Sequence, residues 1–488
     1  MGWRACQPIT TRGNIVTSAP AEHPRRPGAS QRLWRGVVHA LRDPVTPRHF
    51  SHIGDRDRAV EAIHARRVVD LVLRVCEMGL AAGSPASEVT GYGVRVADAY
   101  GVTANVDITS TSVTVSQAGT DFEDPVTSVR IVQLRTQDYQ RLALLERLVT
   151  DIVDGRYDVE AARERLAAIA HASHAYRPWV VTVAMAVLGA SVATGLGGGW
   201  REVVSAFLVT ALVDASVRVF GRLGWSLFFV QAGGAAIATL AALALMVGND
   251  WIPLLLGISP SLVVASGIVS LLTGLSLVAS SRDALDGFHV TAAAGLLEVV
   301  VATGGIVIGI MSALWLGIVA GVPLYLADVA GFGVPAWLGG LSAGLMALAI
   351  GVGAQVRPRG LVPFFLLGAL AWGVHTMSYA ALGERVPATA FAAVAVGVAA
   401  QLGHTRWRMP VVALLTAGVI PLLPGLTLYR GLYGLLQDVE YGGNVGAPGV
   451  LLTALLIGVA IAIGTSLGTQ AVRPLTRSLA LPRRTDGA

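Results

Sequence analysis

Hydrophobic positions are concentrated between residues 178 and 472, where they form successive apolar runs separated by short polar connections. Each run holds about 20 residues, the length of α-helix that crosses roughly 30 Å of hydrocarbon. The pattern therefore predicts an all-α polytopic membrane protein with ten transmembrane helices. The expected spans are residues 179–196, 203–220, 226–247, 252–280, 291–320, 334–355, 361–380, 386–402, 409–432 and 449–472.

Most polar and charged residues lie before the first span. Residues 1–58 are rich in Arg, Pro and Ser and contain no apolar signal-peptide core, so we expect a disordered tail. The next stretch begins with a helical apolar stripe, alternates with period two from Val102 to Val115, and ends in two more helical segments. This order predicts a small α+β domain over 59–177, in which Ser87 and Asp158 can cap helices.

Composition agrees with this division. The chain is 53% hydrophobic and 14% charged, whereas a soluble domain carries about 25% charged residues. Its two cysteines, Cys6 and Cys76, give neither a disulfide framework nor a metal-ligand spacing, and the basic residues do not cluster as in a nucleic-acid-binding protein. We expect no metal, no cofactor and no nucleic-acid partner, and the sequence does not indicate an oligomeric state.

The distribution of arginines predicts the orientation in the plasma membrane. With the N-terminus inside, ten arginines lie in interior connections and in the tail 473–488, and three lie outside. Because positive residues favour the cytoplasmic side, we expect the α+β domain and the C-terminus to be cytoplasmic. The interior set is Arg222, Arg282, Arg357, Arg359, Arg406, Arg408, Arg473, Arg477, Arg483 and Arg484, and the exterior set is Arg201, Arg385 and Arg430.

One apolar motif occurs twice. The segment GIVSLLTGLSL, which begins at Gly267, aligns with GVIPLLPGLTL, which begins at Gly418, and GGIVIGIM at 304–311 meets VAIAIGTS at 459–466. The chain therefore reads as a duplication of a five-helix unit, residues 178–326 and 327–472. Five is odd, so the second unit is expected to be inverted, and inverted repeats with an interrupted helix in each half are typical of transporters.

The repeated motif also carries candidate chemistry. Prolines remove backbone donors and glycine permits unusual backbone angles, so each break can expose backbone polar groups to a substrate at membrane depth. Hydroxyl groups beside the breaks can add hydrogen bonds, although a proline kink that only shapes packing is an alternative interpretation. The candidate substrate-binding residues are Thr273, Gly274, Ser276, Pro421, Pro424, Gly425 and Thr427.

Charged residues inside or next to the spans are candidates for proton coupling or gating, because an ionisable group in a bilayer normally faces protein or water. Asp214 or Glu298 can accept a proton; alternatively, Asp214 and Arg218 form a structural i,i+4 pair and Glu298 reaches the interface. In the inner loop after the first motif, Arg282 and Asp283 can gate the pathway, or Asp283 can cap a helix.

The ordered motifs resemble the threonine/serine exporter (ThrE) family over about residues 60–472. The motifs are LAAGSPASEVTGYGVRVADAYGV, SVRIVQL, GGGWRE, SSRDALDG and PLLPGLTLYRGL. The resemblance implies ten spans, a soluble N-terminal domain and export of L-threonine and L-serine driven by the proton-motive force. Family members usually have prolines in the first motif, where this chain has Ser270 and Thr273, so its first-half helix is either interrupted or straighter.

These observations favour a secondary active exporter of small neutral amino acids that is not an enzyme. A dicarboxylate exporter is an alternative that requires more arginines near the spans than Arg218 and Arg430. A membrane-anchored hydrolase that uses the α+β domain is another, and the chain lacks the G-x-S-x-G and H-E-x-x-H motifs.

Overall fold

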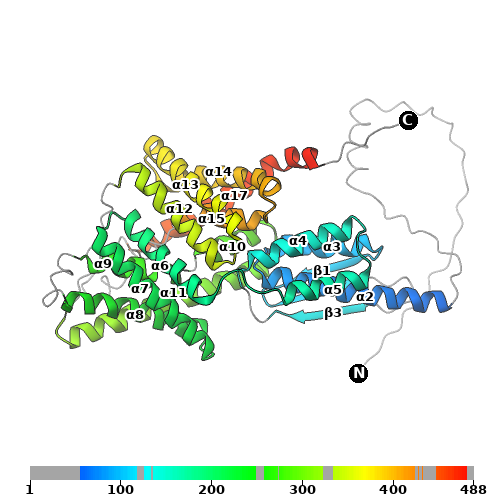
Figure 1. Ribbon diagram of the computed structural model, residues 1–488, viewed down its shortest axis with the longest axis horizontal. Coiled ribbons are helices and arrows are strands. Elements are labelled where there is room, and N and C mark those ends of the chain that lie inside the picture. Colours follow the sequence, from blue (N-terminus) through cyan, green and yellow to red (C-terminus); the bar gives the residue numbers. More distant parts are fainter. Residues whose placement is uncertain are drawn as a thin grey trace, which may run out of the picture. The chain divides into compact units, whose positions relative to one another are not determined.

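The computed structural model describes residues 55–117, 126–132, 136–248, 258–272, 274–322, 334–423, 427, 431 and 447–480 (Figure 1). The chain divides into two units, Met1–Val60 and Glu61–Ala488.

The polar segment forms the expected α+β arrangement, with helices before and after a three-stranded antiparallel sheet of order β1-β2-β3. Alternation places Val113 and Val115 of the central strand on the buried face, where both are fully enclosed. The elements are α2 (Asp55–Ala81), α3 (Ala86–Ala99), β1 (Ala104–Ile108), β2 (Ser112–Gln117), β3 (Val126–Ile131), α4 (Tyr139–Val153) and α5 (Val159–Ala170).

One of the two expected helix caps is confirmed. Asp158 caps α5 by accepting a hydrogen bond from the Ala161 N–H at 2.8 Å. The prediction for Ser87 is wrong, because α3 already begins at Ala86 behind Pro85. The Ser87 hydroxyl instead donates to Asp286 at 2.8 Å, a residue far along the chain.

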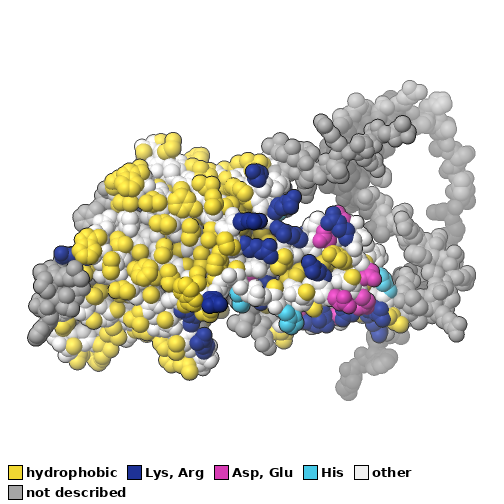
Figure 2. All heavy atoms as spheres, viewed as in Figure 1, with side chains coloured by type: hydrophobic (Ala, Val, Ile, Leu, Met, Phe, Trp, Pro, Cys, Tyr) yellow, Lys and Arg dark blue, Asp and Glu magenta, His cyan; other side chains and the backbone are white. Residues whose placement is uncertain are grey.

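Eight helices among the described residues are long and apolar enough to cross a membrane, which confirms a multi-pass membrane protein. Their outward positions are apolar; Leu297 and Met377, for example, are 64% and 75% exposed. Figure 2 shows hydrophobic side chains over most of the visible face of these helices. The helices are α6 (Pro178–Gly195), α7 (Trp200–Arg222), α8 (Leu227–Gly248), α11 (His289–Val319), α12 (Ala336–Gly353), α13 (Pro358–Leu382), α14 (Arg385–Trp407) and α17 (Ala447–Ala480).

The two remaining expected spans contain the repeated motif, and neither is one continuous helix. The first consists of α9 (Pro260–Gly267), the 3₁₀ turn η2 (Ile268–Leu271) and α10 (Gly274–Leu285), with a bend of 48°. The interrupted alternative for the first half is therefore correct, and the straighter one is wrong. The second begins as α15 (Val411–Val419) and the 3₁₀ turn η3 (Ile420–Leu422) and then passes largely outside the described residues.

The two halves repeat one packing scheme. In the first half α9 and η2 contact α6, α7 and α8, and in the second half α15 and η3 contact α12, α13 and α14. In each half the last helix, α11 or α17, packs along the third, α8 or α14. This repeated scheme supports the duplication; the inverted orientation and the count of ten spans stay predictions.

Glycines fix how closely the last helix of each half approaches its partner. A Cβ atom on Gly305 would lie 2.5 Å from the Phe228 carbonyl oxygen, and one on Gly464 would lie 2.7 Å from that of Ala390. One turn further on, Gly309 and Gly468 meet the next partner carbonyls, so each half has a G-x-x-x-G contact. In the pairing of 304–311 with 459–466, Gly309 corresponds to Gly464, and both contact a carbonyl oxygen of the partner helix, so this register stays a prediction.

Candidate functional site: a cavity between two interrupted helices

Both interrupted helices leave the helical path at the same place in the motif. Leu272 is extended (φ −67°, ψ 125°), and so is its aligned residue Leu423 (φ −58°, ψ 135°). Each donates its N–H three residues back, to Val269 at 3.3 Å and Ile420 at 3.2 Å. Since an extended residue ends the α-helical hydrogen-bond ladder, carbonyl groups of the preceding turn become available to other partners.

A cavity of about 1010 Å³ lies between the two breaks and has walls from both halves of the membrane part. Its volume is at the upper end of what small-molecule sites occupy. Most of the wall is apolar, with a few polar side chains from different elements. These are Gln137, Gln231, Ser270, Ser276, Glu298, Thr303, Ser342 and Trp372.

Three polar groups of this wall are buried without a hydrogen-bond partner: Gln231 Oε1 on α8, Ser270 Oγ on η2 and Trp372 Nε1 on α13. Burying an unpaired polar atom costs about 1–3 kcal/mol, so such groups are rare in a protein interior. One acceptor, one hydroxyl and one N–H donor in one cavity form a set that a small polar ligand can satisfy.

The start of α10 faces the same cavity. Its first turn begins at Gly274, and Ser276 and Leu277 line the wall. A helix N-terminus presents free N–H groups and the positive end of the helix dipole, which favour a carboxylate. Glu298 on α11 also lines the cavity, and its side chain is exposed.

The candidate substrate-binding residues are therefore only partly assembled by the described structure. Ser276 and Pro421 line the cavity, and Gly274 begins the helix that borders it. Thr427 is described, but it is not among the residues that line the cavity. The other three candidates, Thr273, Pro424 and Gly425, lie outside the described residues.

Asp214 and Arg218 do pair across one turn of α7, at 2.9 Å. Arg218 also donates to the Pro178 carbonyl at 3.1 Å and to the Thr182 hydroxyl, both at the start of α6. The pair therefore joins α7 to α6, and neither residue belongs to the described cavity wall. This geometry favours the structural interpretation of the pair over proton coupling.

Arg282 and Asp283 lie where α10 meets the α+β domain. Arg282 Nη2 is 3.8 Å from Glu88 Oε1 of α3, and Asp283 is buried. The Ser87–Asp286 bond lies at the same contact. The end of the first interrupted helix is thus attached to the α+β domain.

Gln231 and Trp372 are not among the site residues predicted from the sequence. Gln231 is the one amide in the third apolar run, and a lone polar residue in a span is a signal that could have identified it. Trp372 carries no comparable signal, because tryptophans in membrane helices commonly mark the interface. Ser270 was visible only as a departure from the proline pattern.

These features define the chain as a multi-pass membrane protein whose helices enclose a small-molecule cavity between two interrupted helices. Family models of threonine/serine exporters match most of it, ThrE at residues 70–317 and ThrE_2 at 340–471. The chain therefore belongs to the threonine/serine exporter family.

Two relatives cover most of the chain. It is 35% identical to a "Probable threonine/serine exporter" of Mycobacterium tuberculosis, over 90% of this chain and 83% of the relative. It is 31% identical to a "Threonine/serine exporter" of Corynebacterium glutamicum, over 83% of each chain. No solved structure matches the chain.

Proposed function

We propose that the protein is a secondary active exporter of small neutral amino acids, with L-threonine and L-serine as substrates, driven by the proton-motive force across the plasma membrane. The observation that carries the proposal is the cavity lined by both interrupted helices, which holds three unpartnered polar groups. The names of the relatives support the substrate class.

The polar groups suit a zwitterion with a hydroxyl side chain. The Trp372 N–H and the N-terminus of α10 would bind the carboxylate. The Gln231 carbonyl oxygen and the carbonyl groups freed at the breaks would accept from the ammonium group. Ser270 and Ser276 would bond the substrate hydroxyl, and Glu298, which faces the cavity, would carry the coupled proton.

The proposed architecture is two inverted five-helix repeats, residues 178–326 and 327–472, behind a cytoplasmic α+β domain at 59–177. The excess of arginines in the interior connections supports this orientation. A cysteine placed at Gly487, in a chain with Cys6 and Cys76 replaced by serine, should resist an impermeant thiol reagent in intact cells. Rapid labelling would place the C-terminus outside.

The lining residues favour a zwitterionic substrate over a dicarboxylate. Two carboxylates in a membrane cavity require cationic partners, and the described part of the wall contains no arginine. Arg218 is held by Asp214 and α6, and Arg430 lies outside the described residues.

Counterflow in proteoliposomes tests the substrate. Labelled threonine and serine should exchange and labelled succinate should not. Ser270→Ala and Trp372→Phe should each raise the concentration for half-maximal exchange about tenfold, because each removes a hydrogen bond to a polar substrate. Ser191→Ala is the control, since the Ser191 hydroxyl bonds to its own helix at Val187.

A proton gradient tests the coupling. Efflux should accelerate with an imposed pH gradient and collapse with an uncoupler, and Glu298→Gln should exchange substrate but fail to respond to the gradient. Efflux that tracks ATP and ignores the gradient would exclude secondary transport.

A further inference from the structure

A second cavity, of about 330 Å³, lies in the α+β domain between α2, β3 and α5. Four arginines line it, together with two acids. Its floor is apolar, with Met78 and Leu166 as the largest side chains. The four arginines are Arg74, Arg130, Arg141 and Arg163, and the two acids are Glu77 and Asp138.

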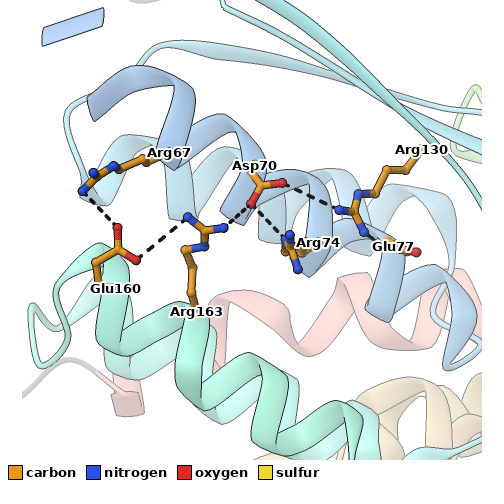
Figure 3. Close-up of polar contacts among 7 residues, drawn as sticks. All are labelled: Arg67, Asp70, Arg74, Glu77, Arg130, Glu160 and Arg163. Carbon is orange, nitrogen blue, oxygen red and sulfur yellow. Dashed lines mark hydrogen bonds and ion pairs between the residues drawn. The ribbon is translucent and has the colours of Figure 1, made fainter. Parts of the chain in front are cut away.

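Positive charge exceeds negative charge around this cavity. Asp70, at its edge, forms ion pairs with three guanidinium groups, those of Arg74 at 2.9 Å, Arg163 at 2.9 Å and Arg130 at 3.7 Å (Figure 3). Glu77 pairs with Arg130 at 2.7 Å, and Asp138 pairs with Arg141 at 3.4 Å and lies 3.5 Å from His174. Glu160 lies between Arg163 at 3.9 Å and a fifth arginine, Arg67, at 3.1 Å. The network therefore holds five arginines and four carboxylates, so one positive charge is left for a ligand.

Hydrogen-bonding capacity is also left over. Each guanidinium has five N–H donors, and the ion pairs use only part of them. Arg141 Nε is buried, and its 3.4 Å contact with Asp138 Oδ2 is an ion pair without hydrogen-bond geometry. A carboxylate matches the fork of a guanidinium, and the apolar floor suits a carbon chain better than a compact inorganic anion.

The segment 136–141 forms walls of both cavities. Thr136, Asp138 and Arg141 line the arginine cavity, whereas Gln137, between them, lines the membrane cavity. Tyr139, two residues after Gln137, is buried. Its hydroxyl lies 2.7 Å from that of Thr416 on α15, the helix that leads into the second break. This segment therefore connects the walls of the two cavities.

We propose that the arginine cavity binds a small organic monocarboxylate, with its carboxylate on Arg74 and Arg163 and its carbon chain against Met78 and Leu166, and that occupancy is transmitted to the membrane cavity through residues 136–141. The second clause rests on the proposed function, since it assigns the membrane cavity to substrate; the binding clause does not.

Calorimetry on the full chain in nanodiscs at low salt tests the binding clause, with butyrate as the probe. Butyrate should bind, and Arg163→Gln and Ala170→Glu should weaken binding about tenfold or more, because one removes a charge-assisted bond and the other adds a carboxylate beside the site. Arg67→Gln is the matched control: Arg67 pairs with Glu160 in the same network but does not line the cavity, so affinity should change less than twofold. Equal thermal midpoints for the variants would show that they fold.

Inorganic phosphate and butylamine complete the binding test. Phosphate that binds as tightly as butyrate would overturn the assignment to an organic carboxylate, and butylamine that binds would overturn the charge argument. No binding of butyrate to the folded chain would leave the arginines as a purely structural network and overturn the proposal.

A fluorophore on Gln137→Cys tests the transmission, in a chain with Cys6 and Cys76 replaced by serine. Butyrate should change its emission in the parent and not in the Arg163→Gln variant. An unchanged signal at saturating butyrate would overturn the second clause. Neither readout measures transport, so a failure here is distinguishable from a failure of the exporter assignment.

Discussion

At its break the interrupted helix of the first half reads Ser270-Leu271-Leu272, whereas that of the second half reads Pro421-Leu422-Leu423. Both nevertheless continue from an α-helix into a 3₁₀ turn and then into an extended leucine. Proline is therefore not required for the break. The shared contacts with three preceding helices hold the same backbone path in both halves, and the side chain at the variable position is free to differ. In the first half that position supplies a hydroxyl to the cavity.

The largest loss of stability is expected from a proline introduced one turn before the break of the first half. Ser270→Pro should cost less than about 1 kcal/mol, because the aligned backbone already holds Pro421. Ser266→Pro should cost about 3 kcal/mol or more, because it places the ring inside α9 against the carbonyl four residues earlier. Thermal midpoints of the purified chain check both, and equal losses would show that the two breaks are not equivalent.

The glycine contacts of the two halves should be similarly sensitive to substitution. Gly309→Ala and Gly468→Ala should each destabilise the chain by about 1–3 kcal/mol, since the added methyl group meets a partner carbonyl. Gly373→Ala is the control, because a Cβ atom there meets nothing within 4 Å. A stable Gly468→Ala variant beside an unstable Gly309→Ala variant would show that the halves pack differently.

The apolar pattern was enough to predict eight of the spans and the α+β order. A span in lipid requires a long apolar run, and a helix or strand packed on a core requires apolar residues at regular intervals. It could not decide whether the first motif is interrupted. Ser270 and Thr273 are compatible with a helix, and the break there depends on contacts between distant segments.

The candidate site was predictable in outline only. The repeated motif led to Ser276 and Pro421, which line the cavity. Gln231 and Trp372 belong to other helices and reach the cavity through the fold. Arg218 was a candidate for proton coupling or gating, and its hydrogen bond to α6 favours a structural role for it.

The two interrupted helices also differ in how they contact the α+β domain. The first carries Arg282 in its last turn, beside Glu88, and the second contacts Tyr139 through Thr416. The first contact lies near a half-buried acid, Glu146, which accepts a hydrogen bond from the Tyr92 hydroxyl at 2.9 Å. Burial, and next the charge of Glu88, raise the pKa of Glu146 to about 7, although the hydrogen bond from Tyr92 and the charges of His404 and Arg95 lower it.

The shift predicts a pH dependence of stability. Because the pKa of Glu146 is higher in the folded chain than its ordinary value of 4.5, the folded state holds a proton that the unfolded state has released. Stability should therefore fall as the pH rises from about 4.5 to about 7, by on the order of 2 kcal/mol. Glu146→Gln should reduce the difference in thermal midpoint between pH 5 and pH 8, and Glu164→Gln, at an exposed position of α5, should not. A parent chain that is more stable at pH 8 than the glutamine variant would contradict the sign.

The smallest effect is expected at the contact of the second interrupted helix. The Thr416 hydroxyl donates to the Val412 carbonyl at 2.9 Å, so the Tyr139 hydroxyl must be the donor in their 2.7 Å bond. Tyr139→Phe therefore removes one bond without leaving a buried donor unpaired, and should cost about 1 kcal/mol. Thr416→Val leaves the buried tyrosine hydroxyl without its acceptor and should cost more than Tyr139→Phe does. In the double variant the second substitution should add little, because the bond is already lost. Thermal unfolding of the four chains measures this cycle, and a larger loss from Tyr139→Phe than from Thr416→Val would reverse the direction of the bond.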